Sequence, residues 1–149
     1  MVKKGEPLTV LIIEDEPDIQ NFISRVLEFE GYEVLKAGDG KTGLEIVREK
    51  PVSLVLLDLR LPGLDGWGVL CEMKQDADLA RIPVVVLTAI AEPVQRRRTM
   101  HMGASQYLVK PLSANSVSKT ITAILNKKVT RDRTPAEKAV RFSEPNIGF

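Results

Sequence analysis

The sequence predicts an α/β fold in which helices cover both faces of a parallel β-sheet. Short apolar runs rich in β-branched residues alternate along the chain with segments of helical period, five times in all. This alternation favours a parallel sheet, because two parallel strands need a crossover connection that is usually a helix. The run 52–57 has almost no polar residue, as expected for a central strand buried on both faces.

The expected strands are short and are bounded by residues that break regular structure. Gly31 stops the helix before the second strand, and Pro83 opens the fourth. In chain order, we expect strands at 8–13, 33–37, 52–57, 84–88 and 106–109.

The helices between these strands carry recognisable start signals. Pro17 suits the first turn of the first helix, whose apolar residues over 19–27 follow the i, i+3, i+4 spacing of one buried stripe. Asp39 and Ser113 are expected to cap the second and the last helix. The fourth helix, about 92–102, has a weak apolar stripe and carries three consecutive arginines, which we expect to form a solvated face.

The chain divides into one domain over 8–126 and a C-terminal tail over 127–149. The tail is charged and lacks a long apolar period. Its segment 134–137 has the pattern of a capping box with proline at the first helical position, which predicts a short helix over 135–142. A frayed tail is the alternative.

The composition is that of a globular protein and excludes several classes of function. A net charge of +1 provides no global attraction to nucleic acid or to a membrane surface. The single cysteine, Cys71, cannot form an internal disulfide, and we expect it to be a small core residue of the third helix. No apolar run is long enough for a signal peptide or a membrane span, so the expected location is the cytoplasm.

Residues suited to phosphoryl transfer lie where the strands end. Glu14 and Asp15 follow the first strand and Asp58 follows the third, while Thr88 ends the fourth and Lys110 follows the fifth. Because the carboxyl ends of parallel strands share one edge, these five residues are expected to meet at one point.

Three carboxylates gathered at one point need a compensating charge. At about 4 Å and an effective dielectric constant near 20, each like-charged pair costs on the order of 4 kcal/mol. A magnesium ion would offset this repulsion, since Mg²⁺ favours carboxylate oxygens. Asp58 could then act as a nucleophile that forms an aspartyl phosphate, with Lys110 and Thr88 contacting the other phosphoryl oxygens.

Five stretches together resemble the receiver domain of two-component response regulators, in particular the stand-alone, chemotaxis-regulator-like type. The resemblance covers about 8–126 and implies a flavodoxin-like, doubly wound sheet with strand order 2-1-3-4-5. The matching stretches are 11–17, 56–63, 86–89, 103–104 and 107–111.

The resemblance also implies a metal site and a phosphoacceptor. Asp58 would be the phosphoacceptor and a metal ligand. Asp15 would be the direct ligand of Mg²⁺, or of Mn²⁺, with Glu14 acting nearby through water. The backbone carbonyl of Arg60 would be a further ligand.

A switch is implied beside this site. Thr88 would be the switch hydroxyl and Lys110 the phosphate-binding lysine. Tyr107 would be the switch aromatic, which turns inward when Thr88 moves onto the phosphoryl group. The bond between Lys110 and Pro111 is expected to be cis, an arrangement that only proline makes inexpensive. Two bulky residues, Arg60 and Ile90, are expected to tune the site by hindering water attack on the phosphoryl group.

The partners that the resemblance implies are a sensor histidine kinase or phosphotransfer protein and a downstream protein. The downstream protein would bind the surface made by the fourth helix, the fifth strand and the last helix; dimerisation on phosphorylation is left open. Such a domain is no enzyme beyond catalysing its own phosphorylation and dephosphorylation. Two alternatives remain. One is a Mg²⁺-dependent phosphatase with an aspartyl nucleophile, although Arg60 stands where such enzymes need a second acid. The other is a protein-binding domain that no longer switches.

Overall fold

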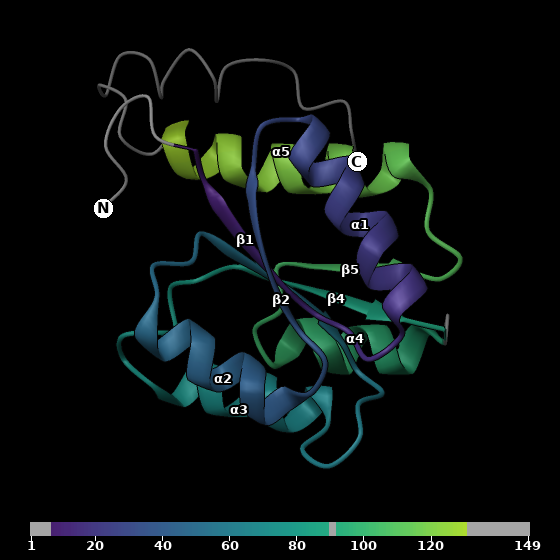
Figure 1. Cartoon of the computed structure of the whole chain (residues 1–149). Coiled ribbons are helices and arrows are strands. Elements are labelled where there is room, and N and C mark those ends of the chain that lie inside the picture. The colour runs from purple at the N-terminus through teal and green to yellow at the C-terminus, as the bar shows by residue number, and fades with distance from the viewer. Residues whose placement is uncertain (1–6, 90–91, 131–149) are drawn as a thin grey trace, which may run out of the picture.

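A single five-stranded parallel sheet forms the centre of the molecule (Figure 1). The computed structural model describes residues 7–89 and 92–130. The strand order β2-β1-β3-β4-β5 confirms the doubly wound α/β fold expected from the sequence. In chain order the elements are β1 (Thr9–Ile13), α1 (Pro17–Phe29), β2 (Glu33–Ala37), α2 (Gly40–Glu49), β3 (Leu54–Asp58), α3 (Gly66–Gln75), β4 (Val84–Thr88), α4 (Pro93–His101), β5 (Gln106–Val109) and α5 (Ala114–Thr130).

The helices form two layers, with α1 and α5 on one face of the sheet and α2, α3 and α4 on the other (Figure 1). Alternate residues of β1 supply the two cores, because successive side chains of a strand point to opposite faces. Leu11 and Ile13 join the core beneath α2 and α3, whereas Val10 and Ile12 join the core beneath α1 and α5. All residues of β3 are buried, as predicted for a central strand, and all residues of β4 are buried too.

Side-chain caps fix where several helices begin. Asp39 accepts a hydrogen bond from the backbone N–H of Thr42 at 2.8 Å, as the sequence predicts for the start of α2. Ser113 Oγ accepts from the backbone N–H of Ser116 at 3.0 Å at the start of α5. The last helix continues to Thr130, beyond the boundary expected at 126. The predicted helix at 135–142 lies outside the described residues.

One expectation about the core is wrong, because Cys71 is exposed. The buried face of α3 is formed by Val69, Leu70 and Met73. Cys71 follows Val69 by two positions, and two helical residues cannot face the same way at that spacing. Its Sγ instead accepts a hydrogen bond from the Gln75 side chain at 3.3 Å.

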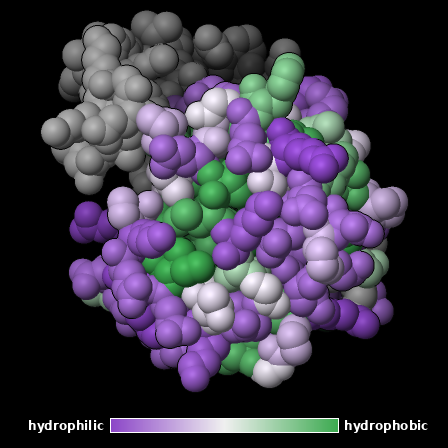
Figure 2. Space-filling model, viewed as in Figure 1, coloured by the Kyte–Doolittle hydropathy of each residue, from purple (hydrophilic) through white to green (hydrophobic). Residues whose placement is uncertain are grey.

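The surface is mostly hydrophilic on the side shown in Figure 2. The hydrophobic colour there gathers in a strip across the middle of the view, where the edge strand β2 runs between the two helical layers (Figures 1 and 2). Within the described ranges, no helix has the length and apolar character needed to cross a membrane.

Candidate functional site

The parallel sheet brings the predicted site residues to one edge. Residue pairing aligns Ile13 with Leu57, Asp58 with Leu87, and Thr88 with Val109. The chain positions just beyond these pairs are the ones that carry Glu14, Asp15 and Lys110. Strand order and register therefore place residues from four strand ends beside each other, although they are distant in sequence.

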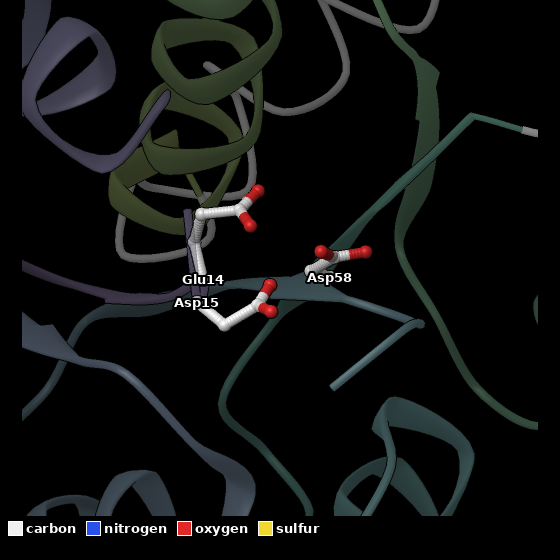
Figure 3. A group of neighbouring side chains, drawn as sticks. All are labelled: Glu14, Asp15 and Asp58. Carbon is white, nitrogen blue, oxygen red and sulfur yellow. The ribbon is translucent and has the colours of Figure 1, made fainter. Parts of the chain in front are cut away.

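Three carboxylates cluster at this edge of the sheet. One oxygen each from Glu14, Asp15 and Asp58 lies within 4.8 Å of the other two. Figure 3 shows the three side chains projecting toward a common space from the ends of two neighbouring strands. Glu14 and Asp58 are buried, whereas Asp15 is exposed, so the cluster opens to solvent on the side of Asp15.

The Lys110 ammonium group bridges the buried carboxylates. Its Nζ lies 2.7 Å from Glu14 Oε1 and donates a hydrogen bond to Asp58 Oδ2 at 3.2 Å. Glu16 Oε1 lies farther away, at 3.7 Å. Among the described residues, the ammonium group of Lys110 is the partner of the buried Glu14 Oε1.

Burial and neighbouring charges shift the proton affinities of this pair. Burial raises the pKa of Glu14 from 4.5 to about 7, even though the Lys110 ammonium and the backbone N–H of Glu16 lower it. Burial alone would lower the pKa of Lys110, but the carboxylates of Glu14 and Asp58 together outweigh it, and the net shift is upward. The two acids that Lys110 contacts therefore stabilise its protonated, positively charged form.

Backbone groups hold the two buried carboxylates in place. Asp58 Oδ1 accepts a hydrogen bond from the backbone N–H of Arg60 at 3.0 Å, and Glu14 Oε2 accepts one from the backbone N–H of Glu16 at 3.2 Å. Gly66 packs directly against the backbone of Asp58, so closely that a Cβ at this position would collide with the Asp58 carbonyl oxygen. The phosphoacceptor candidate is therefore fixed from both its side chain and its main chain.

The donor set fits Mg²⁺. At Mg–O distances of about 2.0–2.1 Å, oxygens on opposite sides of the ion are about 4.1 Å apart. Oxygens gathered within 4.8 Å can approach this spacing with small side-chain movements or through retained waters. The exposure of Asp15 leaves room for those waters.

Thr88 and Tyr107 both lie within reach of one side chain of α4. The Gln95 side chain of α4 connects them, since its Nε2 is 3.5 Å from Thr88 Oγ1 and 3.4 Å from the Tyr107 hydroxyl. Tyr107 is only 6% exposed. Its ring thus lies inward in this structure.

The structure also locates most of the other residues that the sequence singles out. The side chain of Arg60 is exposed beside Asp58, and the Lys110–Pro111 bond is cis. Ile90 lies outside the described residues. All three arginines of α4 are exposed, but Arg98 also stacks over Trp67, with its guanidinium carbon 4.8 Å from the ring centroid.

Three polar residues near the site had no signal in the sequence. Glu16 and Gln95 contact site residues as described above. The Gln20 side chain donates to the backbone carbonyls of Glu14 and Ala37 at 3.1 and 3.2 Å, which ties α1 to the ends of β1 and β2. None of these contacts follows from spacing along the chain, because each depends on where a helix lies over the sheet edge.

The acids and the lysine lie at the carboxyl edge of a doubly wound α/β sheet, which is where proteins of this fold class bind their ligands. Comparison with known families makes the assignment specific, since the model of the response regulator receiver domain matches residues 10–122. The chain belongs to the response regulator receiver domain family. Members of this family are signalling proteins that work with histidine kinases or phosphotransfer proteins, and they generally bind Mg²⁺.

Individual relatives agree with this assignment. The chain is 35% identical over 118 residues to the "Probable transcriptional regulator ycf27" of Porphyridium aerugineum, covering 79% of this chain and 48% of that protein. It is 33% identical over 116 residues to "Protein PilH" of Pseudomonas aeruginosa, covering 78% and 96% of the two chains. It thus spans about half the length of the ycf27 regulators and nearly all of PilH.

Solved structures show the same architecture. A response regulator receiver domain protein of Clostridium thermocellum matches with a TM-score of 0.74 at 32% identity, covering 81% of this chain and 96% of that one. Chemotaxis protein CheY4 of Vibrio cholerae matches with a TM-score of 0.75 at 25% identity, covering 78% and 98%.

Proposed function

We propose that this chain is a phosphorylation-controlled switch that accepts a phosphoryl group on Asp58 with the help of Mg²⁺. The observation that carries the proposal is that Asp58 belongs to a carboxylate cluster and also contacts the ammonium of Lys110. The carboxylates supply a cation site, and the ammonium supplies a fixed positive charge for phosphoryl oxygens. Membership of the receiver family supports this assignment.

Each group then has a distinct part in the transfer. A carboxylate oxygen of Asp58 forms a bond to phosphorus, while the bond from phosphorus to the histidine nitrogen of the donor breaks and its electron pair stays on that nitrogen. Lys110 contacts a phosphoryl oxygen and loses its interaction with the ionised Asp58. When bound at Glu14, Asp15, Asp58 and the Arg60 carbonyl, Mg²⁺ would neutralise charge on the acids and on the phosphoryl oxygens. Thr88 donates its hydroxyl to another phosphoryl oxygen.

The proposal includes an output surface on α4, β5 and α5. Gln95 connects this surface to the site, because it contacts Thr88 and Tyr107 from α4. The surface also exposes apolar side chains suited to a protein partner, with Val94 67% and Val109 39% exposed. The phosphodonor would be a histidine kinase or phosphotransfer protein in the cytoplasm. The sizes of Arg60 and Ile90 would set how fast water removes the phosphoryl group.

Intact mass spectrometry after incubation with acetyl phosphate and Mg²⁺ tests this proposal. We expect one phosphoryl adduct that requires Mg²⁺ and is absent from Asp58→Asn. Asp65→Asn is the matched control, since it removes a nearby carboxylate but keeps a residue that can cap α3. An adduct that persists in Asp58→Asn would refute the assignment of the phosphoacceptor. No adduct in the native chain would favour a binding domain that does not switch.

A further inference from the structure

The face that α4 turns toward the sheet is largely polar. Thr99 is fully buried, and its Oγ1 donates to the backbone carbonyl of Gln95 at 2.8 Å. Gln95 is half-buried, and its side chain reaches the end of β4. Arg98, one turn further along, stacks on Trp67 of α3. The position of α4 therefore depends on a few directional contacts as well as on apolar packing.

Gln95 is the residue of α4 that meets both hydroxyls beside the site. Its Nε2 lies 3.5 Å from Thr88 Oγ1 and 3.4 Å from the Tyr107 hydroxyl oxygen. Both contacts are at the long end of the hydrogen-bond range, so each is weak and easily exchanged. Thr88 ends β4 and Tyr107 belongs to the neighbouring strand β5, so one side chain spans two strands.

Donor and acceptor rules give these contacts a direction. The nitrogen of a side-chain amide can only donate hydrogen bonds, whereas a hydroxyl oxygen can accept one while its own hydrogen is donated elsewhere. The hydroxyl oxygens of Thr88 and Tyr107 therefore both accept in their contacts with Gln95. The hydrogen of the Thr88 hydroxyl is directed to a partner other than Gln95.

We propose that Gln95 is a positioning residue for phosphoryl binding. It orients the Thr88 hydroxyl so that its hydrogen is donated to a phosphoryl oxygen on Asp58, and it joins this hydroxyl to Tyr107 and to α4. The inference rests on the proposed function of Asp58. It adds a residue that acts on the phosphoryl group only through Thr88.

The test uses beryllofluoride, a complex that mimics a phosphoryl group on a carboxylate. Its affinity for the whole chain is measured in the presence of Mg²⁺ by fluorine NMR, from the bound and free signals. Gln95→Met keeps the length of the side chain but removes its donor. We expect it to weaken beryllofluoride binding roughly three- to fivefold, as loss of a weak hydrogen bond does.

A double-mutant cycle separates positioning from a general structural role. In a Thr88→Val background there is no hydroxyl to orient, so Gln95→Met should change the affinity no further. A loss of equal size in both backgrounds would overturn the proposal, and so would unchanged affinity in the single variant. Gln75→Met on α3 is the matched control and should bind like the native chain.

Beryllofluoride binding by the native chain and by Asp58→Asn distinguishes failure of the proposed function from failure of this inference alone. If the native chain does not bind beryllofluoride, or binds it equally well as Asp58→Asn, the proposed function fails and this inference with it. If the native chain binds through Asp58 and only the predicted cycle is absent, this inference alone fails. Thermal unfolding of each variant shows whether it is folded, and Gln95→Ala replaces Gln95→Met if the latter is not.

Discussion

At the scale of single residues, Glu14 shows how burial and charge compete in this site. The carboxylate is 1% exposed and lies next to both an ammonium group and another acid. Burial has the largest influence, and it raises the pKa of Glu14 to about 7. The metal-free site is therefore partly protonated near neutral pH, and ionisation of Glu14 works against the folded state.

This shift predicts how stability depends on pH in the absence of metal. The folded-state pKa of Glu14 is above its value of 4.5 in the unfolded chain, so its contribution is fully present below pH 4.5 and is lost as pH rises to about 7. At about 1.4 kcal/mol for each pKa unit, the loss is at most about 3.5 kcal/mol. Glu14→Gln should remove this part of the pH dependence. Urea unfolding in EDTA measures it.

The exposed Glu33 on β2 provides the comparison for this experiment. Glu33→Gln should unfold with the pH profile of the native chain. Parallel profiles for the native chain and Glu14→Gln between pH 4.5 and 7 would contradict the assigned shift.

At the scale of elements, the start of α3 is coupled to the end of β3 by close backbone packing. A Cβ on Gly66 would lie within 2.5 Å of Leu59 Cα and even closer to the Asp58 carbonyl oxygen. Both neighbours are main-chain atoms, which cannot rotate away as a side chain can. The first residue of α3 must therefore be glycine for Asp58 to keep its place.

Gly66→Ala is expected to affect stability and site chemistry together. Overpacking of this kind costs about 1–3 kcal/mol, and the backbone shift that relieves it moves Asp58. We expect a lower free energy of unfolding in urea and slower phosphorylation by acetyl phosphate. Gly38→Ala is the control, because no atom lies within 4 Å of a Cβ at that position. Native phosphorylation by a destabilised Gly66→Ala would show that the two effects are separate.

At the scale of the whole molecule, the site spans parts of the fold that only the complete sheet brings together. Its acids come from β1 and β3, and its lysine follows β5 at the far edge of the sheet. The acids form a cation-binding site only in the folded chain. Metal binding should therefore stabilise the whole domain by mass action.

We predict that Mg²⁺ raises the melting temperature of the native chain. At a concentration 100 times the dissociation constant, the gain is about 2.7 kcal/mol, which corresponds to about 5–10 °C for a domain of this size. Asp15→Asn should lose most of this shift, whereas Asp65→Asn should keep it. Thermal unfolding followed by circular dichroism, with Mg²⁺ or with EDTA, measures the difference. An equal shift in Asp15→Asn would remove Asp15 from the metal site.

Fold class, element order and the residues at the strand ends follow from local sequence patterns. Helical period, β-branched runs and caps such as Asp39 act over a few residues, so they can be interpreted without tertiary information. The strand ends expected at 13, 57 and 88 fall where the structure has them to within one residue.

How these residues contact one another depends on the folded arrangement of the whole chain. The pairing of Lys110 with Glu14, the inward position of Tyr107 and the reach of Gln95 to two hydroxyls depend on strand stagger and on how helices lie over the sheet. The residue type of Cys71 favours the core, yet the rotation of α3 exposes this side chain. Such contacts join residues far apart in the chain, and their energies depend on burial, which no local pattern encodes.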